Sequence, residues 1–458
     1  MTHIHLIGIS GSGLSAIARI LLESGYTVSG SDRAPNALGQ ELASLGAVVH
    51  TGHAAENIAG ADLVVRSSAI PDSNPEVQAA CAAGIPVLKR SAFLGRLLEG
   101  KTTVAVAGTH GKTTTSAMLA WALTRLEADP SYIIGGVSNN LHCNAHAGQG
   151  SQFVIEADEY DRMFLGLTPS VAIVTMLEHD HPDCYPTMDD YTQAFVAFLN
   201  QVQSGGITLL NQDNPACADL RFEIPAGRAV FTYGLTDTAN YHAVNISRNS
   251  SGCLDADVTF NQAHLAHLSM QVPGEHNICN ACAALAALHN LGFDPQLAAD
   301  ALSEFSGTGR RFDIRAIIGG ITVIDDYAHH PTEIRTTLAA ARERFPGQRI
   351  WAVWQPHTYS RTQTLLPQFA ASFTDADQVI VTEVFASREQ NPGFSSARVV
   401  EKMDHAAVRF IETLTDTASY LIKQLEPGDV VLVLSAGDAD QVSAAVVAAL
   451  KAKENRHE

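Results

Sequence analysis

The segment Thr103-Val104-Ala105-Val106-Ala107-Gly108-Thr109-His110-Gly111-Lys112-Thr113-Thr114 decides the fold of this chain. Its apolar start is typical of a buried strand, and the spacing of residues from Ser116 to Leu126 predicts a helix. Between them, two glycines let backbone N–H groups turn toward phosphate oxygens. Lys112 adds a positive charge, and the Thr113 hydroxyl can ligate Mg²⁺. We therefore predict a loop that binds a nucleoside triphosphate.

This loop departs from the strict phosphate-loop pattern. That pattern has glycine where Val106 stands, so the segment is a shortened variant. The alternative interpretation is a solvated Gly-Lys turn at the start of a helix. The buried strand before the loop and the amphipathic helix after it favour nucleotide binding.

Length and charge limit the possible functions. A chain of 458 residues holds two to four domains at about 100–200 residues each. The formal net charge of −19 disfavours a general nucleic-acid binder, because such a protein needs a basic surface to displace counterions. A small phosphate-bearing substrate needs only a local cluster of donors and cations, so this charge does not exclude it.

Cysteine usage and hydropathy predict a cytoplasmic protein. The chain has seven cysteines, and the CxxC pair Cys279 and Cys282 lies in an alanine-rich helical stretch without a second pair. Buried free thiols are therefore expected rather than zinc or a disulfide. We expect no signal peptide, because the sequence runs directly into the strand-like His3 to Ile7, and no apolar run approaches the ~18 residues of a membrane span.

The chain repeats the order strand, turn, helix, which predicts parallel sheets covered by helices. We expect an α/β protein of three domains at residues 1–99, 100–306 and 307–458. The first and third domains are expected to be Rossmann-like. The central domain should combine the phosphate loop with added antiparallel strands, because polar and apolar residues alternate between Tyr233 and Met270.

Acidic side chains and a histidine follow two further apolar strands of the central domain. Phosphoryl transfer needs acidic groups to hold Mg²⁺, and α/β sheets place their ligands at the carboxyl ends of strands. The candidates at these strand ends are Glu156, Asp158, Asp180, His181 and Asp183. A solvated surface loop is the alternative interpretation, and it competes most strongly for Glu159, Glu178 and His179.

A second glycine loop, Gly8-Ile9-Ser10-Gly11-Ser12-Gly13, follows the first predicted strand and opens a helix. Asp32 lies at the end of the next strand, as in dinucleotide-binding folds. Such loops bind a diphosphate at a helix N-terminus, which suits either NAD(P) or a UDP-sugar. The phosphate loop for ATP in the same chain favours the nucleotide-sugar.

Six motifs together resemble the Mur ligases of peptidoglycan synthesis, in that family's order and over nearly the whole chain. They are Gly108 to Thr114, Glu156 to Glu159, Asp180 to Asp183, Gly274 to Asn277, Gly309 to Phe312 and Asp325 to Glu333. The segment Gln355 to Thr362 is also similar to a stretch of the family. The resemblance implies that the three domains bind the UDP part of the substrate, ATP, and ATP together with an amino acid, in that order.

The resemblance also implies roles for the matched positions. In the first domain, the residues assigned to the UDP-substrate are Gly8, Ser10, Gly11, Ser12, Gly13, Ser15, Asp32, Ser67 and Ser68. The residues assigned to ATP are Gly108, Thr109, His110, Gly111, Lys112, Thr113, Thr114, Asn277, Asn280, Arg311 and Asp326. Two Mg²⁺ ions, or Mn²⁺ in their place, are expected on Thr113, Glu156 and His181. The expected catalytic residues are Lys112, Glu156, His181, Arg311 and His329.

The activity that the resemblance implies is an ADP-forming ligation of L-alanine to the lactyl carboxylate of UDP-N-acetylmuramate, through an acyl phosphate. A base must then take a proton from the ammonium group of alanine. His329, His330 and a carboxylate near Asp180 are candidates, although both histidines could equally be structural residues before Pro331. The expected partners are these substrates alone, without nucleic acid or membrane, bound by a monomer or homodimer.

Other functions stay open at this point. Tyr160-Asp161 resembles a member of the family that attaches a recovered tripeptide to the same UDP-sugar, but the short passage from Met163 to Pro169 lacks the insertion expected there. A nicotinamide-dependent oxidoreductase would use the first glycine loop and leave the phosphate loop unexplained. A non-catalytic nucleotide-binding regulator is disfavoured by the intact phosphate loop and metal ligands.

Overall fold

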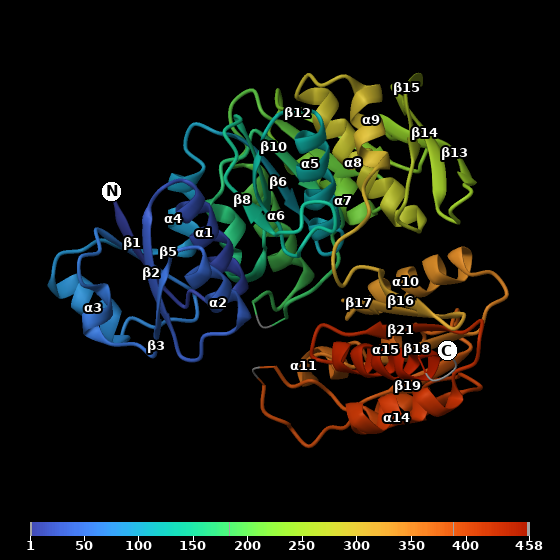
Figure 1. Cartoon of the computed structure of the whole chain (residues 1–458). Coiled ribbons are helices and arrows are strands. Elements are labelled where there is room, and N and C mark those ends of the chain that lie inside the picture. Colours follow the sequence, from blue (N-terminus) through green and yellow to red (C-terminus); the bar gives the residue numbers. More distant parts are fainter. Residues whose placement is uncertain (1, 183, 388, 456–458) are drawn as a thin grey trace. The chain divides into compact units, whose positions relative to one another are not determined.

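Three β-sheets organise the chain in the computed structural model, which describes residues 2–182, 184–387 and 389–455 (Figure 1). Asp183, one of the predicted strand-end carboxylates, lies outside the described residues. The predicted α/β class with three domains is confirmed, since each sheet carries its own helices.

The first sheet has five parallel strands in the order β3-β2-β1-β4-β5. Its strands are β1 (His3–Ile7), β2 (Thr27–Asp32), β3 (Val48–Thr51), β4 (Leu63–Arg66) and β5 (Val87–Lys89). Its helices are α1 (Ser12–Glu23), α2 (Ala37–Ser44), the 3₁₀ turn η1 (Ala55–Ile58), α3 (Pro75–Ala82) and α4 (Arg90–Leu97). Because α1 buries Leu14, Ile17 and Leu21 along one stripe, it packs on the sheet directly after the first glycine loop.

The central sheet has ten strands in the order β15-β14-β13-β12-β11-β10-β6-β9-β7-β8. They are β6 (Thr102–Ala107), β7 (Ser131–Ile133), β8 (Ala145–His146), β9 (Gln152–Glu156), β10 (Val171–Val174), β11 (Ile207–Asn211), β12 (Ala229–Gly234), β13 (Tyr241–Arg248), β14 (Leu254–Phe260) and β15 (Ala263–Ser269). The first of the added strands, β13, pairs with β12 in parallel. The turn between β14 and β15 has only two residues, so these two strands form an antiparallel hairpin, as predicted.

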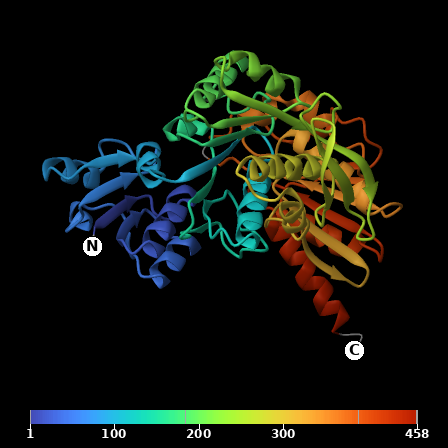
Figure 2. The ribbon, with the colours of Figure 1, turned by 90° about the horizontal axis from the view of Figure 1, so that it is seen from above.

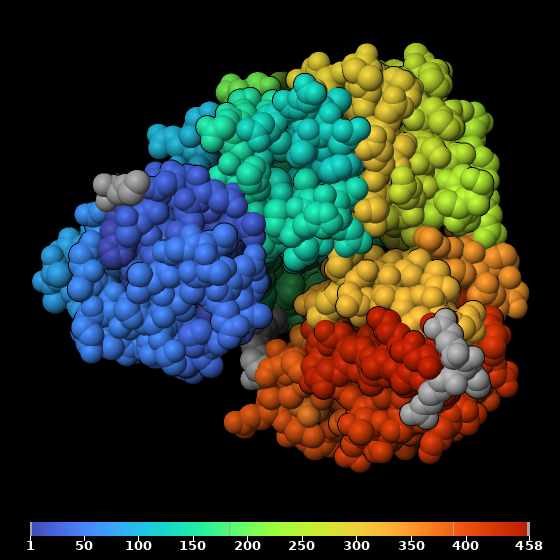
Figure 3. Space-filling view, viewed as in Figure 1, coloured from blue at the N-terminus to red at the C-terminus, as the bar shows by residue number. Residues whose placement is uncertain are grey.

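Helices cover the central sheet. They are α5 (Lys112–Arg125), η2 (Tyr160–Gly166), α6 (Met188–Leu199), α7 (Pro215–Asp219), η3 (Leu220–Glu223), α8 (Glu275–Asn290) and α9 (Pro295–Ser303). In the space-filling view, α5 and α9 lie side by side (Figure 3). A bidentate ion pair between Arg125 and Glu304, with distances of 2.6 and 2.9 Å, joins the ends of these two helices.

The third sheet has six strands in the order β16-β17-β21-β18-β19-β20, of which only the pair β16–β17 is antiparallel. Its strands are β16 (Asp313–Ile318), β17 (Ile321–Asp326), β18 (Ile350–Trp354), β19 (Gln378–Val381), β20 (Val408–Phe410) and β21 (Val430–Leu434). Its helices are α10 (Pro331–Arg344), α11 (Tyr359–Thr364), α12 (Leu366–Ala370), α13 (Ala397–Val400), α14 (Leu414–Gln424) and α15 (Asp440–Glu454). A hydrophobic core lies on each face of this sheet, and β18 and β21 are therefore buried along their whole length.

The chain divides into two compact units. One contains the residues up to Val244 with Asp257–Leu268 and Cys279–Phe305, and the other contains Asn245–Ala256, Ser269–Ile278 and the residues from Ser306 onward. The first sheet and most of the central sheet therefore share a unit, and their helices and strands can be followed from a second direction in Figure 2. The predicted bounds of the three domains stay predictions. Among the described residues, no helix is long and apolar enough to cross a membrane.

Candidate active site

The phosphate loop has the predicted surroundings, since β6 ends at Ala107 and α5 begins at Lys112. Gly108 has a φ of +131°, and a Cβ there would lie 2.2 Å from Thr175 Oγ1. Gly111 caps the helix with a φ of +84°, and its Cβ would lie 2.8 Å from Asn280 Oδ1. Only glycine fits these two positions, so the loop has the close backbone approach that phosphate binding needs.

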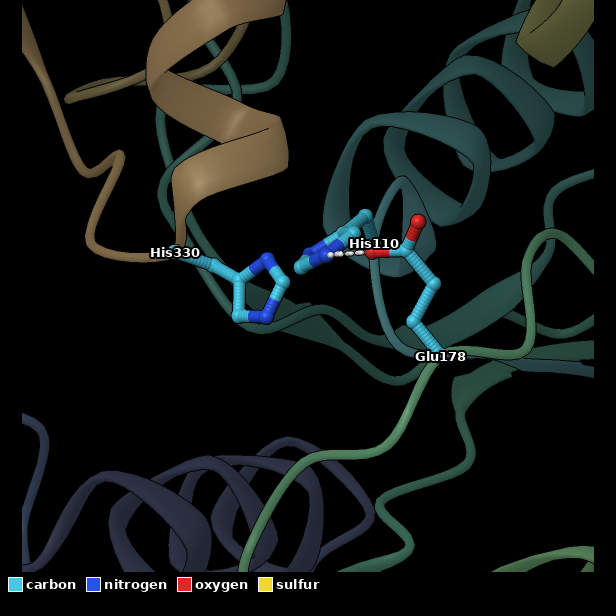
Figure 4. A group of neighbouring side chains, drawn as sticks. All are labelled: His110, Glu178 and His330. Atoms are coloured by element: carbon cyan, nitrogen blue, oxygen red, sulfur yellow. Dashed lines mark ion pairs between the residues drawn. The ribbon is translucent and has the colours of Figure 1, made fainter. Parts of the chain in front are cut away.

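Side-chain contacts fasten the loop to the segment after β10. The Thr109 hydroxyl donates to the carbonyl of Glu178 and accepts from its N–H, both at 2.9 Å, and the Thr109 N–H donates to Met176 O at 2.9 Å. His110 Nε2 lies 3.4 Å from a carboxylate oxygen of Glu178 (Figure 4). The loop is thus held in shape by the protein itself, and Glu178 acts here through its backbone and side chain.

Lys112 is the cation of the loop and has 14% of its side chain exposed. Its Nζ donates to Gly108 O at 2.6 Å and lies 2.9 Å from Glu159 Oε1. Burial lowers the pKa of Lys112, but the charges of Glu159, Glu156 and Asp158 raise it above its ordinary value. The ammonium therefore stays protonated at neutral pH.

Glu159 is the countercharge of Lys112 and is only 1% exposed. Tyr191 donates to Glu159 Oε1 at 3.2 Å, and His181 Nε2 lies 3.8 Å from the same oxygen. Its other oxygen, Oε2, is buried without a hydrogen-bond partner among the described residues. Burial raises the pKa of Glu159, and the Lys112 charge opposes this rise. The surface-loop alternative is therefore wrong for Glu159. The acidic residues around it in the sequence did not predict that it is buried.

The predicted metal ligands are only partly brought together. Thr113 Oγ1 donates to Glu156 Oε2 at 2.9 Å, and the N–H of Gly135 donates to the same oxygen at 2.8 Å. His181 lies instead beside Glu159 and Asp180, 3.7 Å from Asp180 Oδ2, with its ring against Tyr160. Thr113 and Glu156 offer hard oxygen atoms at a strand end, which suits Mg²⁺.

His179, a weaker strand-end candidate, has a structural contact. Its Nε2 bonds the carbonyl of Tyr185 at 2.7 Å. Because that carbonyl can only accept, the imidazole donates and helps to hold the loop before α6.

A pocket of about 610 Å³, including the space open to solvent, runs from the first glycine loop to Glu156 and Asp158 at the end of β9. Its polar lining comes from both ends: Ser12, Gly13 and Arg90 on the first domain, and Gly135, Asn144, Glu156 and Asp158 on the central domain. One small substrate in this pocket would therefore meet the diphosphate loop and the carboxylates beside Lys112.

Arg90 is the pocket residue that the sequence did not indicate. Its guanidinium lies 3.4 Å from Asp158 and its Nε lies 2.8 Å from the Met163 sulfur, so it bridges the two domains of this unit. A Cβ on Gly13 would lie 1.6 Å from Arg90 Nη1, so Gly13 is needed where the arginine passes the loop. The arginine follows β5 without any motif, and only the folded chain brings it to the loop.

The first glycine loop turns as predicted. Gly8 has a φ of +89°, its N–H donates to Ser31 O at 2.8 Å, and the N–H of Gly11 closes the turn on Gly8 O at 3.0 Å. Asp32 accepts from the N–H of Ser10 at 3.2 Å.

The other residues predicted for the UDP-substrate surround this loop. Ser12 and Gly13 line the pocket, whereas the Ser15 hydroxyl is buried and donates to Ser12 O at 3.1 Å. Ser67 packs 3.3 Å from the Cβ position of Gly8, and Ser68 is exposed next to it. Ser15 therefore shapes the first turn of α1 rather than facing the pocket.

Two predicted ATP residues lie on α8. Asn280 is buried, and its Oδ1 meets the Cβ position of Gly111, so it lies against the phosphate loop. Asn277 is buried and donates to Pro273 O at 2.7 Å. Next to it in the second unit, burial and the charge of Arg311 lower the pKa of His276 to about 4.

The other ATP residues predicted in the second unit surround the end of β17. Arg311 lies 3.3 Å from Glu333 and over the ring of Tyr327. Asp326 accepts from the N–H groups of Phe312 and Ala328, both at 2.7 Å, and burial raises its pKa to about 6. Asp326 thus shapes its own loop through the backbone.

The two histidines before Pro331 have different hydrogen bonds. His330, at the start of α10 in Figure 4, is the N-cap of this helix. Its Nδ1 accepts from the N–H of Thr332 at 3.3 Å. His329 Nδ1 bonds the carbonyl of Tyr327 at 2.9 Å, so Nδ1 carries the proton and Nε2 is the basic nitrogen of the ring. His330 thus caps α10, and the bond to Tyr327 leaves Nε2 as the unprotonated nitrogen of a neutral His329 ring.

Family models match almost the whole chain. They are the Mur ligase family catalytic domain at residues 3–102, the Mur ligase middle domain at residues 106–288 and the Mur ligase glutamate ligase domain at residues 310–437. The UDP-N-acetylmuramate–L-alanine ligase of Salinibacter ruber is 42% identical over 453 residues, covering 98% of this chain and 95% of its own. That of Thermobifida fusca is 40% identical over 457 residues, covering 98% and 96%.

Solved structures give the same result. The UDP-N-acetylmuramate-alanine ligase of Thermotoga maritima superposes with a TM-score of 0.83 at 30% identity, covering 99% of this chain and 100% of its own. A murein peptide ligase from Psychrobacter arcticus gives a TM-score of 0.71 at 27% identity, covering 98% and 99%. With the two glycine loops and the carboxylates between them in place, the chain belongs to the Mur ligase family.

Proposed function

We propose that the chain uses ATP to join L-alanine to the lactyl carboxylate of UDP-N-acetylmuramate in peptidoglycan precursor synthesis. Relatives that carry this activity in their names match it at about 40% identity over nearly their whole length. The structural observation that carries the proposal is the pocket that runs from Ser12, Gly13 and Arg90 to Glu156 and Asp158. It lets one substrate reach from the first glycine loop to Glu156, which accepts a hydrogen bond from Thr113 next to the phosphate loop.

The first chemical step is attack of the lactyl carboxylate on the γ-phosphate of ATP. Lys112 lies at the start of α5 and supplies charge to the transferring oxygens, together with the backbone N–H groups of the loop. The second-unit Arg311 is proposed to add a further positive charge. ADP leaves and an acyl phosphate remains.

Mg²⁺ bound at Thr113, Glu156 and His181 would neutralise charge on the phosphates. The contact between Thr113 and Glu156 supports these two ligands, because their hydroxyl and carboxylate oxygens already lie next to each other. His181 lies beside Glu159, so we add Glu159 to the residues that shape the metal site. Two Mg²⁺ ions, with Mn²⁺ as a substitute, remain part of the proposal.

The amine of alanine then attacks the acyl phosphate, and phosphate leaves as the amide forms. We assign the removal of the ammonium proton to His329, because its Nδ1–H is committed to Tyr327 O and its Nε2 is basic. The site must exclude water while the acyl phosphate exists, which is consistent with residues drawn from several domains. A cytoplasmic location and a monomer or homodimer complete the proposal.

Phosphate release with UDP-N-acetylmuramate and ATP, measured across L-alanine, L-serine, glycine and the murein tripeptide, tests this function. L-alanine should give the highest kcat/KM. Preference for the tripeptide would assign the chain to recycling of wall peptides. Release with none of these amines, together with NADPH binding, would favour an oxidoreductase instead.

A further inference from the structure

Glu76 is a fully buried carboxylate inside the first domain, at the start of α3, and no step above uses it. Its Oε1 accepts from Asn57 Nδ2 at 2.6 Å and from the N–H of Ala54 at 3.3 Å. Its Oε2 accepts from the Ser31 hydroxyl at 2.5 Å. His5 Nε2 lies 3.5 Å from Oε2, a separation at which charge matters more than hydrogen bonding.

The charge state of Glu76 follows from these contacts. Burial alone would raise the pKa of Glu76, but the contacts with His5, Ser31 and Asn57 lower it to about 2. The group is therefore a carboxylate at neutral pH, and a carboxylate can only accept hydrogen bonds.

The proton count on Ser31 then fixes the tautomer of His53. Ser31 has one hydroxyl proton and donates it to Glu76. His53 Nδ1 lies 2.9 Å from the same hydroxyl oxygen, so Nδ1 must be the donor of that hydrogen bond. In neutral imidazole, the other nitrogen, Nε2, is then an acceptor.

His53 lies at the edge of the sheet where ligands of such folds bind. It follows the end of β3 by two residues, and β3 pairs with β2 so that Thr51 is opposite Asp32. The N–H of Gly52 donates to Asp32 O at 2.7 Å. The His53 side chain is 13% exposed, and its contacts with Ser31 and Glu76 are both through Nδ1.

We propose that Glu76, acting through Ser31, is a positioning residue that holds His53 with an unprotonated Nε2 at the edge of the first sheet where the strands end. There, Nε2 accepts a hydrogen bond from the nucleoside of the UDP-substrate, so this inference rests on the proposed function. The donor is an N–H or O–H of uridine: the imide N3–H of uracil or the ribose 2′-hydroxyl. Cytosine has an acceptor at N3, and 2′-deoxyribose lacks one hydroxyl, so nucleotide analogues separate the two sources.

The tautomer can be measured directly in the wild-type protein by ¹⁵N NMR of labelled histidines, with the His53 signals assigned from a His53→Gln variant. We expect a protonated Nδ1 and an unprotonated Nε2 for His53. In Ser31→Ala, the proton should move to Nε2, the tautomer that unconstrained histidine side chains favour. A protonated Nε2 in the neutral wild-type ring overturns the proposal.

Calorimetric binding of UDP, CDP and 2′-deoxy-UDP measures the consequence. One lost neutral hydrogen bond corresponds to roughly a three- to tenfold weaker affinity. We expect that loss for CDP if the base is the donor and for 2′-deoxy-UDP if the ribose is, and Ser31→Ala should abolish the difference. Equal binding of all three nucleotides by the wild-type protein overturns the proposal.

Ser29→Ala is the matched control. Ser29 is a buried serine two residues earlier on β2 and on the same face, and its hydroxyl bonds His3 and His5 instead. This variant should keep the preference among nucleotides. If it loses the preference as Ser31→Ala does, the role of Ser31 is structural and the proposal fails. Absence of any UDP binding by the wild-type protein would overturn the proposed function, whereas the tautomer measurement does not depend on it.

Discussion

The ammonium of Lys112 and the carboxylate of Glu159 lie 2.9 Å apart, and Glu159 is almost completely buried. A buried lysine without a countercharge would lose its proton, because a low-dielectric environment disfavours the charged form. Glu159 therefore keeps Lys112 charged, which a phosphate ligand requires. This contact connects the acidic motif to the phosphate loop, so the charge of Lys112 depends on both segments.

Lys112→Ala should preserve binding of UDP-N-acetylmuramate and lower the rate of phosphate release by at least about 10²–10³-fold, the cost of losing one stabilising group at a transferring oxyanion. Burial already raises the pKa of Glu159, so this carboxyl can take up a proton in the variant and the fold should survive. Calorimetry and a phosphate assay measure both effects.

Lys101→Ala is the control for this variant. Its Nζ bonds Gly150 O at 2.8 Å at the beginning of β6, away from the loop. If Lys112→Ala kept its rate of phosphate release, or if Lys101→Ala lost as much of it, the proposal that this loop binds ATP would be wrong.

Arg90→Lys should raise the KM for UDP-N-acetylmuramate about tenfold and leave the KM for ATP within about twofold. Lysine keeps the charge but cannot present the planar fork that bridges Asp158 and the pocket. Gly13→Ala should have a similar effect, since its Cβ would occupy the position of the guanidinium. Steady-state kinetics with each substrate varied separates the two KM values.

Arg96→Lys, at an exposed position of the same helix, should behave as the wild-type enzyme. If Arg90→Lys instead raised the KM for ATP alone, the arginine would belong to the nucleotide side of the pocket.

His329→Gln should lower kcat for amide formation by about 10²–10⁴-fold, because the amine loses its base. Formation of the acyl phosphate should continue, since that step needs no proton from alanine. Trapping the acyl phosphate with hydroxylamine in the absence of alanine measures the first step, and amide yield measures the second.

His330→Asn tests the other histidine. Asparagine is a good N-cap, so the start of α10 should be kept and activity should stay within about twofold. If a folded His330→Asn protein showed the defect expected of His329→Gln, His330 rather than His329 would be the base.

Asp325→Asn should stabilise the protein at pH 8 and not at pH 4. Burial raises the pKa of Asp325 from 3.8 to about 6, so the folded state binds the proton more tightly than the unfolded state. The stability from this group is present below pH 4 and is lost as pH rises through 6. The gain at pH 8 is therefore about 1–3 kcal/mol and should vanish near pH 4.

Chemical denaturation at both pH values measures this gain. Asp404→Asn, an exposed position of the same unit, should change stability little at either pH. A gain of equal size at pH 4 would mean that the buried charge is not its cause.

Local patterns were enough to predict much of this molecule. The strand, loop and helix around Lys112 and the turn at Gly8 are where the sequence placed them, since both depend on neighbours in the chain. Arg90 could not be found in this way, because its partners Asp158 and Met163 lie about 70 residues away and only folding brings them together.

Burial was the other limit. Glu159 follows two acidic residues and has the composition of a solvated loop, yet packing of Tyr185 and Tyr191 around it buries it. Strand pairing was a third limit: alternation predicted the added strands, but the parallel pairing of β13 with β12 depends on the connection between them. The roles of the individual site residues remain predictions that the variants above address.

The two hydrogen bonds between the Thr109 hydroxyl and the backbone of Glu178 have a consequence for the kinetics of nucleotide exchange. A loop that the protein already holds in its binding shape loses little conformational entropy when ATP arrives, and it gains little when ADP departs. Association of ATP should therefore be fast and free of a slow ordering phase. Thr109→Val keeps the side-chain volume but removes both hydrogen bonds to Glu178, so this variant should show such a phase.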